Sequence, residues 1–279
     1  MVNRMPLFRK DDVDLNYIVK GEAKGETLVL VHGFGTKLQG WHFQIEFFKN
    51  LMKVIALDNR GVGKSSRPDQ PYTMDMFVED LNALLEYLEI EEKIHLCGIS
   101  MGGMIVQHYA LKYPEKLKTL ILCATSGRLE QGFHKMVDGL KKMEPLTPEE
   151  KIMELLPFLF SRKYARTLKK DAELFNFLKD DVVFIVPARG PTRIKDYENQ
   201  ASAIETHDTS NLLDKIEVPT LILGASKDRL VPLPNQQVLH EKIEGSRFEI
   251  IEGAGHGFTI EQPERVNEII WEFIKQHSE

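Results

Sequence analysis

The feature that most constrains the fold of this chain is one serine at the junction of a strand and a helix. Residues 93–97 form an apolar run typical of a buried strand, and residues 101–113 have the pattern of a helix. Gly98 and Gly102 flank Ser100 at a distance of two residues on either side. So tight a bend gives the serine a positive φ and brings the chain close to both flanking positions, where no Cβ fits. The pattern therefore predicts a nucleophile elbow that presents the hydroxyl above the sheet edge.

The length of 279 residues is enough for one large α/β domain, or for a domain with a large insertion. The net charge is -6 and no basic stripe is present, which argues against nucleic acid as a partner. No stretch approaches the roughly 20 apolar residues of a membrane span. The amino end also lacks the apolar segment of a signal peptide. We therefore expect a cytoplasmic protein with no membrane span, and the oligomeric state is left open.

The two cysteines, Cys97 and Cys123, each fall inside an expected buried strand. A thiol in that setting packs as a small apolar side chain, and neither a disulfide nor a metal site is expected there. The chain contains no Cys-x-x-Cys or His-Glu-x-x-His pattern, the spacings typical of metal sites. We therefore expect no metal and no cofactor.

Short apolar runs alternate with amphipathic segments along most of the chain, and this alternation predicts the fold class. Helical crossovers between strands give a mostly parallel sheet with helices on both faces. We expect an α/β fold whose eight strands lie at 7–9, 13–19, 27–31, 54–57, 93–97, 117–123, 220–224 and 247–251. The helices around this sheet are expected at 41–50, 76–88, 101–113, 235–243 and 264–275.

The alternation stops at Thr125 and resumes at Pro219. Between them the pattern is almost entirely helical, as in the helix that Thr147 begins, and it is strand-like only at 182–186. We therefore expect residues 1–126 and 211–279 to form the α/β core. Residues 127–210 are expected to form a helical insertion between two strands of that core.

A serine hydroxyl is a weak nucleophile until a base accepts its proton and a third group holds that base. Of the nine histidines, His256 lies in a glycine-rich loop directly after the last expected strand. Loops at the carboxyl ends of parallel strands face one crevice, so this loop faces Ser100. His95 and His108 fall inside an expected strand and helix, where packing is their expected role. His256 is therefore the expected base.

The acid that orients this base is expected in another loop at the end of a strand. Asp228 follows the run at 220–224 and precedes Val231-Pro232. The loop after the run at 117–123 reads Ala124-Thr125-Ser126 and has no carboxylate. Asp228 is therefore the expected third member of the catalytic group.

The negative oxygen of a tetrahedral intermediate needs backbone donors, each worth roughly 3 kcal/mol of the barrier. The N–H of Met101 follows the nucleophile and begins the helix, so it is one expected donor. The N–H of Phe34 is the second, in a loop that Gly33 and Gly35 allow to approach closely. His32 is expected to brace this loop rather than to react.

These motifs together resemble the α/β-hydrolase superfamily over nearly the whole chain, including its order of serine, acid and histidine along the sequence. The resemblance is carried by His32-Gly33-Phe34-Gly35, by Asp58-x-Arg60-Gly61-x-Gly63-x-Ser65, by the elbow, by the loop around Asp228 and by Gly-x-Gly-His256. It implies that Asp58 and Arg60 are structural and fix the loop beside the oxyanion hole. It also implies that the insertion at 127–210 is a helical cap over the active site.

The resemblance implies a serine hydrolase that works through an acyl-enzyme. Ser100 replaces the aspartate that epoxide hydrolases and haloalkane dehalogenases carry at the elbow. Ile99 and the loop at 34–36 differ from the patterns of the carbon–carbon bond hydrolases, and Met101 differs from that of proline iminopeptidases. A carboxylesterase is the expected enzyme, acting on a small-molecule ester. Enol-lactonase, acyl-thioester hydrolase (including acyl-coenzyme A), perhydrolase or haloperoxidase, and a binding protein without turnover stay open as alternatives.

The expected substrate pocket lies between the core loops and the insertion. Phe34, Met101, Val231 and Phe258 are expected to line it because their motifs fix their places, and Phe158 is expected to join them from the insertion. The insertion also supplies a set of large apolar side chains: Phe133, Met136, Met143, Leu155, Leu156, Phe158, Leu159, Phe160, Phe175 and Phe177. About two-thirds of these are expected to form the insertion's own core, and the rest an acyl tunnel for short to medium chains.

Overall fold

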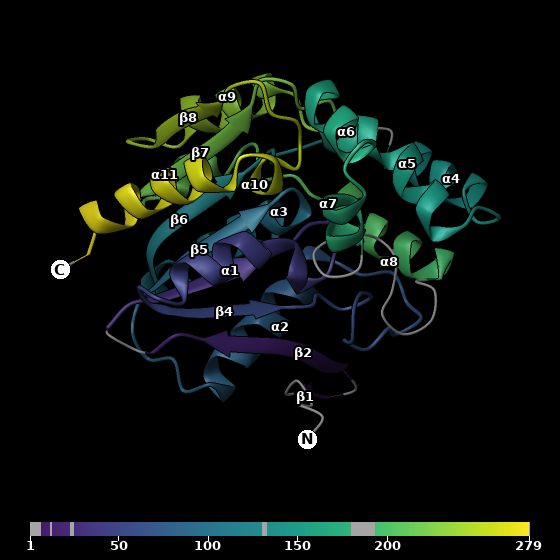
Figure 1. Ribbon diagram of the computed structural model, residues 1–279. Coiled ribbons are helices and arrows are strands. Elements are labelled where there is room, and N and C mark those ends of the chain that lie inside the picture. Colours follow the sequence, from purple (N-terminus) through teal and green to yellow (C-terminus); the bar gives the residue numbers. More distant parts are fainter. Residues whose placement is uncertain (1–6, 12, 23–24, 130–132, 180–192, 279) are drawn as a thin grey trace.

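The centre of the molecule is an eight-stranded sheet with the strand order β1-β2-β4-β3-β5-β6-β7-β8 (Figure 1). The computed structural model describes residues 7–11, 13–22, 25–129, 133–179 and 193–278. The strands are β1 (Leu7–Lys10), β2 (Val13–Lys20), β3 (Thr27–Val31), β4 (Lys53–Leu57), β5 (Ile94–Ile99), β6 (Leu117–Cys123), β7 (Thr220–Ala225) and β8 (Arg247–Ile251).

The directions of the strands confirm the expected, mostly parallel sheet. β1 pairs with β2 and β2 with β4 in antiparallel fashion, whereas the six strands β3 to β8 are parallel to one another. Each parallel connection is a crossover, so the loops after β3, β5, β6, β7 and β8 all leave from the same edge of the sheet. That edge is where the candidate site lies.

Helices cover both faces of the sheet, and a third group follows β6. Four of the five expected core helices have nearly their expected bounds; the expected helix at 41–50 is a 3₁₀ turn followed by the short α1. The short helix α10 directly after the His256 loop was not expected. The helices are α1 (His42–Phe48), α2 (Met74–Tyr87), α3 (Met101–Lys112), α4 (Phe133–Lys142), α5 (Pro148–Leu159), α6 (Arg162–Leu168), α7 (Ala172–Phe177), α8 (Ile194–Glu205), α9 (Leu233–Lys242), α10 (Phe258–Glu261) and α11 (Pro263–Gln276).

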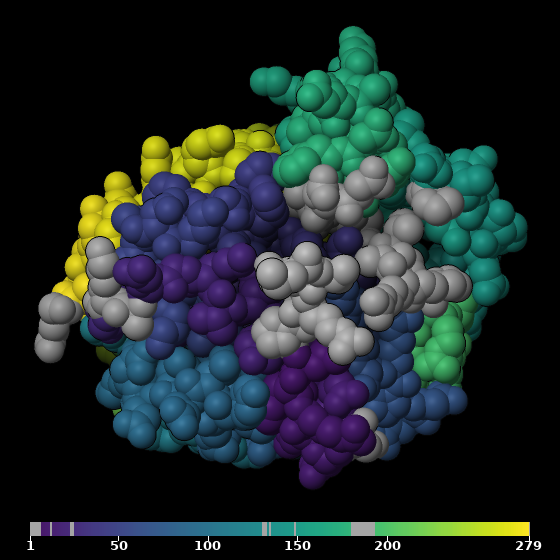
Figure 2. All heavy atoms as spheres, turned by 60° about the horizontal axis from the view of Figure 1, so that its bottom comes forward, coloured from purple at the N-terminus to yellow at the C-terminus, as the bar shows by residue number. Residues whose placement is uncertain are grey.

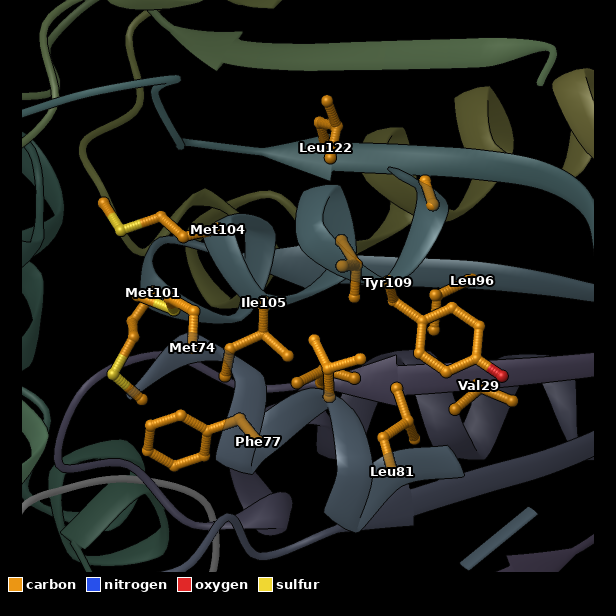
Figure 3. Packing of buried hydrophobic residues seen from close by; sticks show 14 of the residues in the cluster. Val29, Met74, Phe77, Leu81, Leu96, Met101, Met104, Ile105, Tyr109 and Leu122 are labelled. Atoms are coloured by element: carbon orange, nitrogen blue, oxygen red, sulfur yellow. The ribbon is translucent and has the colours of Figure 1, made fainter. Parts of the chain in front are cut away.

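Alternate residues of each strand point to opposite faces, so the sheet separates two hydrophobic cores. In β3, Val29 and Val31 belong to the core under α2, α3 and α9, whereas Leu28 and Leu30 belong to the core under α1 and α11. Figure 3 shows part of the first core, where side chains of α2 and α3 lie together with those of β3, β5 and β6. The elbow helix is thus held by burial along its length, and Tyr109 is fully buried.

Helices α4 to α8 lie beyond the carboxyl ends of the parallel strands (Figure 1). In the space-filling view their atoms, teal to green, stand beside the purple and blue atoms of the amino-terminal half (Figure 2). Part of this segment has a core of its own around Ile152, Leu156 and Leu168. The boundaries of the expected domains stay a prediction, and the strand-like stretch at 182–186 lies outside the described residues.

The chain leaves the core after β6 and returns to it before β7 at one polar junction. His108 Nε2 on α3 lies 3.0 Å from His207 Nδ1, and His207 Nε2 lies 3.0 Å from the carbonyl oxygen of Ser126. The Thr209 N–H donates to the Gly127 carbonyl at 2.7 Å. Burial lowers the pKa of His207 to about 4 and also lowers the pKa of His108.

In the part of the chain that the structure describes, no helix has the length and apolar character needed to cross a membrane.

The buried His207 makes stability depend on pH. Because its folded pKa of about 4 lies below the ordinary value of 6.5, the unfolded chain binds more protons between these values, and stability falls as the pH drops from 6.5 to 4. We expect His207→Gln, which cannot charge, to flatten that part of the curve by on the order of 3 kcal/mol. Urea unfolding at several pH values measures this, and an unchanged slope in the variant would contradict it.

Candidate active site

Ser100 lies in a strained turn between β5 and α3. Its φ is 56° and its ψ is -123°, values that a residue with a side chain rarely adopts. A Cβ on Gly98 would collide with the backbone of Gly102, and one on Gly102 would collide with the carbonyl oxygen of Val31. The turn is therefore possible only with glycine at both flanking positions, as the sequence predicts. The Ser100 N–H donates to the Cys123 carbonyl at 2.9 Å, which ties the turn to β6.

His256 and Asp228 are in direct contact although they follow different strands. The Nδ1 atom of His256 lies 2.7 Å from Oδ2 of Asp228, and both residues are buried. The second oxygen, Oδ1, accepts the N–H groups of Leu230 at 2.8 Å and Val231 at 2.9 Å. These bonds fix the carboxylate, so Nδ1 of the imidazole is occupied and Nε2 remains for other chemistry.

The structure brings Ser100 and His256 to one cavity, and Asp228 lies behind His256. The loop that carries His256 is held from both sides. The Gly257 N–H donates to the Leu159 carbonyl at 2.7 Å, and the Gly255 N–H donates to Glu261 Oε2 at 3.0 Å. Both bonds fix a glycine-rich backbone that would otherwise have many conformations.

The two expected oxyanion donors lie at the same cavity as Ser100. Phe34 and Met101 both line it, and a Cβ on Gly33 would approach the Ser100 Cβ to 3.0 Å. Among the described residues, neither the Phe34 N–H nor the Met101 N–H donates to another protein group. Both amides are therefore available to a bound molecule, whereas the Gly33 N–H donates to His32 Nδ1 at 2.7 Å.

The loop after β4 holds the loop after β3 in place. Asp58 accepts the Leu38 N–H at 2.7 Å and the Lys64 N–H at 2.9 Å, while burial raises the pKa of its carboxyl. The Asn59 side chain donates to the His32 carbonyl at 2.8 Å. Arg60 makes a bidentate pair with the buried Asp80 at 2.6 and 2.7 Å. These contacts fit the structural roles expected of Asp58 and Arg60.

His32 lies at the wall of the cavity but is not suited to act as a base. Burial, with a smaller contribution from nearby His256, lowers the pKa of His32 to about 3. Its Nδ1 already accepts the Gly33 N–H, and its ring packs edge-on against Trp41. The ring is neutral near pH 7, and it braces the loop as expected.

Gln200 is a residue of the site that sequence reasoning missed. It is fully buried on α8, where its Oε1 accepts the Gly35 N–H at 2.9 Å and its Nε2 donates to the Arg60 carbonyl at 2.8 Å. One side chain from the inserted helices therefore joins the loop after β3 to the loop after β4. The positions are 165 residues apart, so no local signal in the sequence points to this contact.

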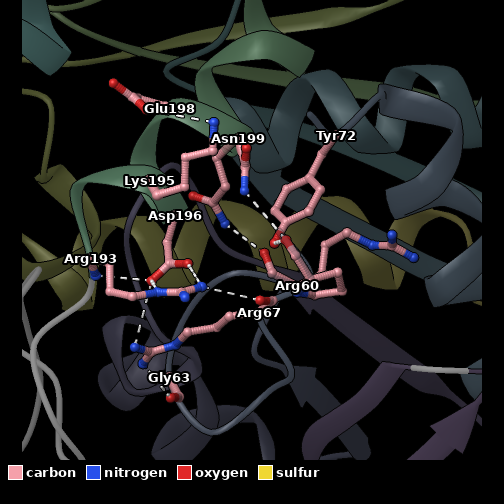
Figure 4. Close-up of polar contacts among 11 residues, drawn as sticks. Arg60, Gly63, Arg67, Tyr72, Arg193, Lys195, Asp196, Glu198 and Asn199 are labelled. Carbon is pink, nitrogen blue, oxygen red and sulfur yellow. Dashed lines mark hydrogen bonds and ion pairs between the residues drawn. The ribbon is translucent and has the colours of Figure 1, made fainter. Parts of the chain in front are cut away.

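Neighbouring polar contacts hold α8 against the loop after β4. The buried Asp196 pairs with Arg193 at 2.7 Å and with Arg67 at 3.8 Å, and Asn199 Nδ2 donates to the Pro68 carbonyl at 3.3 Å (Figure 4). The position of Gln200 is thus fixed by a network rather than by one bond.

The cavity has a volume of about 560 Å³ and is bounded by core loops on one side and by α4 and α5 on the other. Phe34, Met101, Val231 and Phe158 line it, as expected. Phe258 does not. It begins α10 and is fully buried in the core that α1 and α11 cover, because the chain turns into that helix directly after Gly257.

The apolar side chains of the insertion also differ from expectation. Seven of the ten line the cavity: Phe133, Met136, Met143, Leu155, Phe158, Leu159 and Phe160. Half of the set, rather than the expected two-thirds, packs in the core around Ile152: Leu156, Leu159, Phe160, Phe175 and Phe177. The reason is that α4 presents one apolar stripe to the cavity, at positions three and four residues apart. Only Leu156, Phe175 and Phe177 of the set do not line it.

Comparisons with known proteins agree with this architecture. The family model described as "alpha/beta hydrolase fold" matches residues 26–263. The chain belongs to the α/β-hydrolase family. Among its relatives, 3-oxoadipate enol-lactonase 2 of Acinetobacter baylyi (strain ATCC 33305 / BD413 / ADP1) is 29% identical over 279 residues, with 98% of this chain and 99% of the relative covered.

Two further relatives of this hydrolase carry different names. The poly(3-hydroxyalkanoate) depolymerase of Ectopseudomonas oleovorans is 29% identical, with 97% of this chain and 93% of the relative covered. The solved structure of a thermophilic esterase from Thermogutta terrifontis has a TM-score of 0.81 and 28% identity, with 95% of this chain and 94% of that chain covered. Hydrolase is the class of enzyme that these relatives support for this chain.

We expect Gln200→Leu to lower kcat/KM for a neutral ester about tenfold or more, because a loosened loop misplaces the Phe34 amide. The loss is expected in kcat, with KM little changed. Asn199→Leu is the matched control, since Asn199 anchors the same helix through Pro68 but does not touch Gly35. Steady-state kinetics of both variants measure the effect, and equal losses in the two would contradict a specific role for Gln200.

Proposed function

We propose that this hydrolase cleaves carboxylic esters of small to medium acyl chains through an acyl-enzyme. The observation that carries the proposal is the buried contact of 2.7 Å between His256 and Asp228, at one cavity with the strained Ser100. Ser100 attacks the ester carbonyl, and its proton passes to His256 Nε2. Asp228 orients the imidazole and stabilises its charged form.

The proposed oxyanion hole consists of the Phe34 and Met101 amides. Each donor contributes roughly 3 kcal/mol when it is aimed at the oxygen that gains charge in the transition state. When the tetrahedral intermediate collapses, His256 returns the proton to the leaving oxygen and the C–O bond breaks. Water then attacks the acyl-enzyme with the same base, and the carboxylic acid is released.

The lining of the cavity supports an apolar acyl group as the bound part of the substrate. Most of the side chains that face it from α3, α4 and α5 are aliphatic, aromatic or methionine, among them Met104, Phe133, Met136 and Leu140. A volume of about 560 Å³ suits a small molecule rather than a folded polymer.

Enol-lactonase is the second candidate. It is supported by the relative of that name from Acinetobacter baylyi, which the chain matches over nearly its full length. A lactone is an internal ester, so the same serine, base and amides serve both reactions. The apolar lining favours an ester with a free acyl chain over a small polar ring.

Replacement of the nucleophile tests the proposed chemistry. With 4-nitrophenyl butyrate as the substrate, we expect Ser100→Ala to lower kcat by about 10⁴-fold or more, because no covalent intermediate can form. Circular dichroism of the variant controls for folding. Near-normal turnover by a folded variant would exclude Ser100 as the nucleophile.

A panel of substrates separates the ester from the lactone. We expect kcat/KM for 4-nitrophenyl esters to rise from acetate to hexanoate, since each buried methylene adds about 0.8 kcal/mol of transfer free energy. Five- and six-membered lactones are expected to react more slowly. Lactones that exceed every ester of the panel in kcat/KM would favour the second candidate instead.

A further inference from the structure

The charge around the cavity is opposite in sign to that of the protein. The chain has 42 acidic and 36 basic residues, yet the described residues that line the cavity include no aspartate or glutamate. They do include Lys135 and Arg229, both of which are exposed. An apolar chamber with cations only at its exposed rim fits a molecule with an apolar part inside and an anionic part at the rim.

Arg229 lines the cavity in the loop that fixes His256. It directly follows Asp228, which holds His256, and in the proposed mechanism His256 gives its proton to the leaving atom. The Nη1 atom of Arg229 donates to the Pro157 carbonyl at 3.0 Å. Among the described residues Arg229 has no carboxylate partner, so its charge is available to a ligand.

Lys135 reaches the rim from the other wall. It lies on α4, which packs against the loop after β3 through Phe133 and Phe34, whose ring centroids are 4.8 Å apart. Phe133 and Met136 line the chamber, whereas Lys135 is exposed. Phe158, which is 50% exposed, adds an apolar surface at the same cavity.

A separate group of basic residues lies on α6, which follows α5 in the chain. A second hollow of about 450 Å³ is lined by Arg162, Lys163, Arg166, Thr167 and Lys170 of α6 and the turn after it. Within the described part of the chain none of these four cations has a carboxylate partner. The inserted helices thus carry a second group of cations, on α6.

We propose that the substrate of this hydrolase has an anionic leaving group, an alcohol or thiol that bears a carboxylate or phosphate, which Arg229 and Lys135 bind. This inference rests on the proposed ester hydrolysis and adds a substrate class to it. The apolar acyl part occupies the chamber. The anionic part remains at the rim, from which it departs when the C–O or C–S bond breaks.

Two pairs of substrates test the inference, each pair with the same acyl group. The first pair is 5-butyryloxy-2-nitrobenzoate and 4-nitrophenyl butyrate, which differ by a carboxylate on the leaving group. The second is butyryl-coenzyme A and S-butyryl-pantetheine, which differ by the phosphorylated nucleotide. The ratio of kcat/KM for the charged and the neutral member is the anion preference. Its change between variants is independent of intrinsic reactivity.

We expect Arg229→Gln and Lys135→Gln each to lower the anion preference about threefold, and the double variant about tenfold, in at least one pair. Any loss that a variant causes equally in both members of a pair cancels in this ratio, so the ratio reports only the binding of the anionic group. Arg229→Lys retains the charge and is expected to retain most of the preference. The preference of wild type is also expected to fall as salt is raised, because the cations are exposed.

Lys227→Gln is the control, since Lys227 is an exposed cation of the same loop that does not line the cavity. If the variants lower the anion preference in the first pair alone, the group that the cations bind is a carboxylate or another single charge. If they lower it in the second pair alone, that group is phosphorylated. An anion preference that the double variant leaves unchanged in both pairs would overturn the inference. If only this inference fails, wild type still hydrolyses the neutral substrates. If the proposed function fails, wild type hydrolyses none of the four substrates.

Discussion

The site depends on one backbone conformation, the positive φ of Ser100. The turn stores strain that the rest of the structure must offset, because a residue with a side chain is disfavoured there by about 1–3 kcal/mol. Burial of α3 against α2 and the strands offsets it, together with the bond from the Ser100 N–H to β6. The turn fixes the Ser100 hydroxyl and the Met101 amide relative to each other, with no flexible side chain between them. The same geometry excludes any Cβ at Gly98 and Gly102.

A second requirement is that loops from different strands keep their places without an extended hydrogen-bonded ladder. Each loop is held by a polar side chain, buried in Asp58 and Gln200 and half-buried in Glu261, that bonds to backbone groups of its neighbours. Asp58 holds the loop at Leu38, Gln200 holds the one at Gly35, and Glu261 holds the one at Gly255. Buried polar groups of this kind are costly unless they are satisfied, so they favour one arrangement of the loops over all others. The site is therefore preorganised by polar contacts and stabilised by the apolar cores on either side.

The sequence was sufficient for the features that depend on local pattern. Strand positions, the elbow and the order of Ser100, Asp228 and His256 follow from runs of apolar residues and from the loops that end them. Phe258 was placed in the pocket because its motif lies beside His256, but two residues are enough for the chain to turn into α10 and bury the ring. Gln200 was missed because its partners are far away in the sequence. A helical stripe shows that a face is buried, but it does not show whether a core or a cavity lies opposite, which is why the apolar side chains of α4 and α5 were misassigned.

The core and the inserted helices have different roles in the site. This difference explains how the substrate of such a site can change while its chemistry stays the same. The reacting groups and the proposed oxyanion amides come from loops of the sheet, whereas most of the chamber wall and one of the two rim cations come from the inserted helices. A substitution of a side chain of α4 that lines the chamber is therefore expected to alter which molecule binds, without moving Ser100 or His256. Two contacts are exceptions. Gln200 of α8 bonds to the loop that carries Phe34, and the Leu159 carbonyl of α5 accepts the Gly257 N–H beside His256. The inserted helices therefore contribute to the alignment of the site as well as to its selectivity.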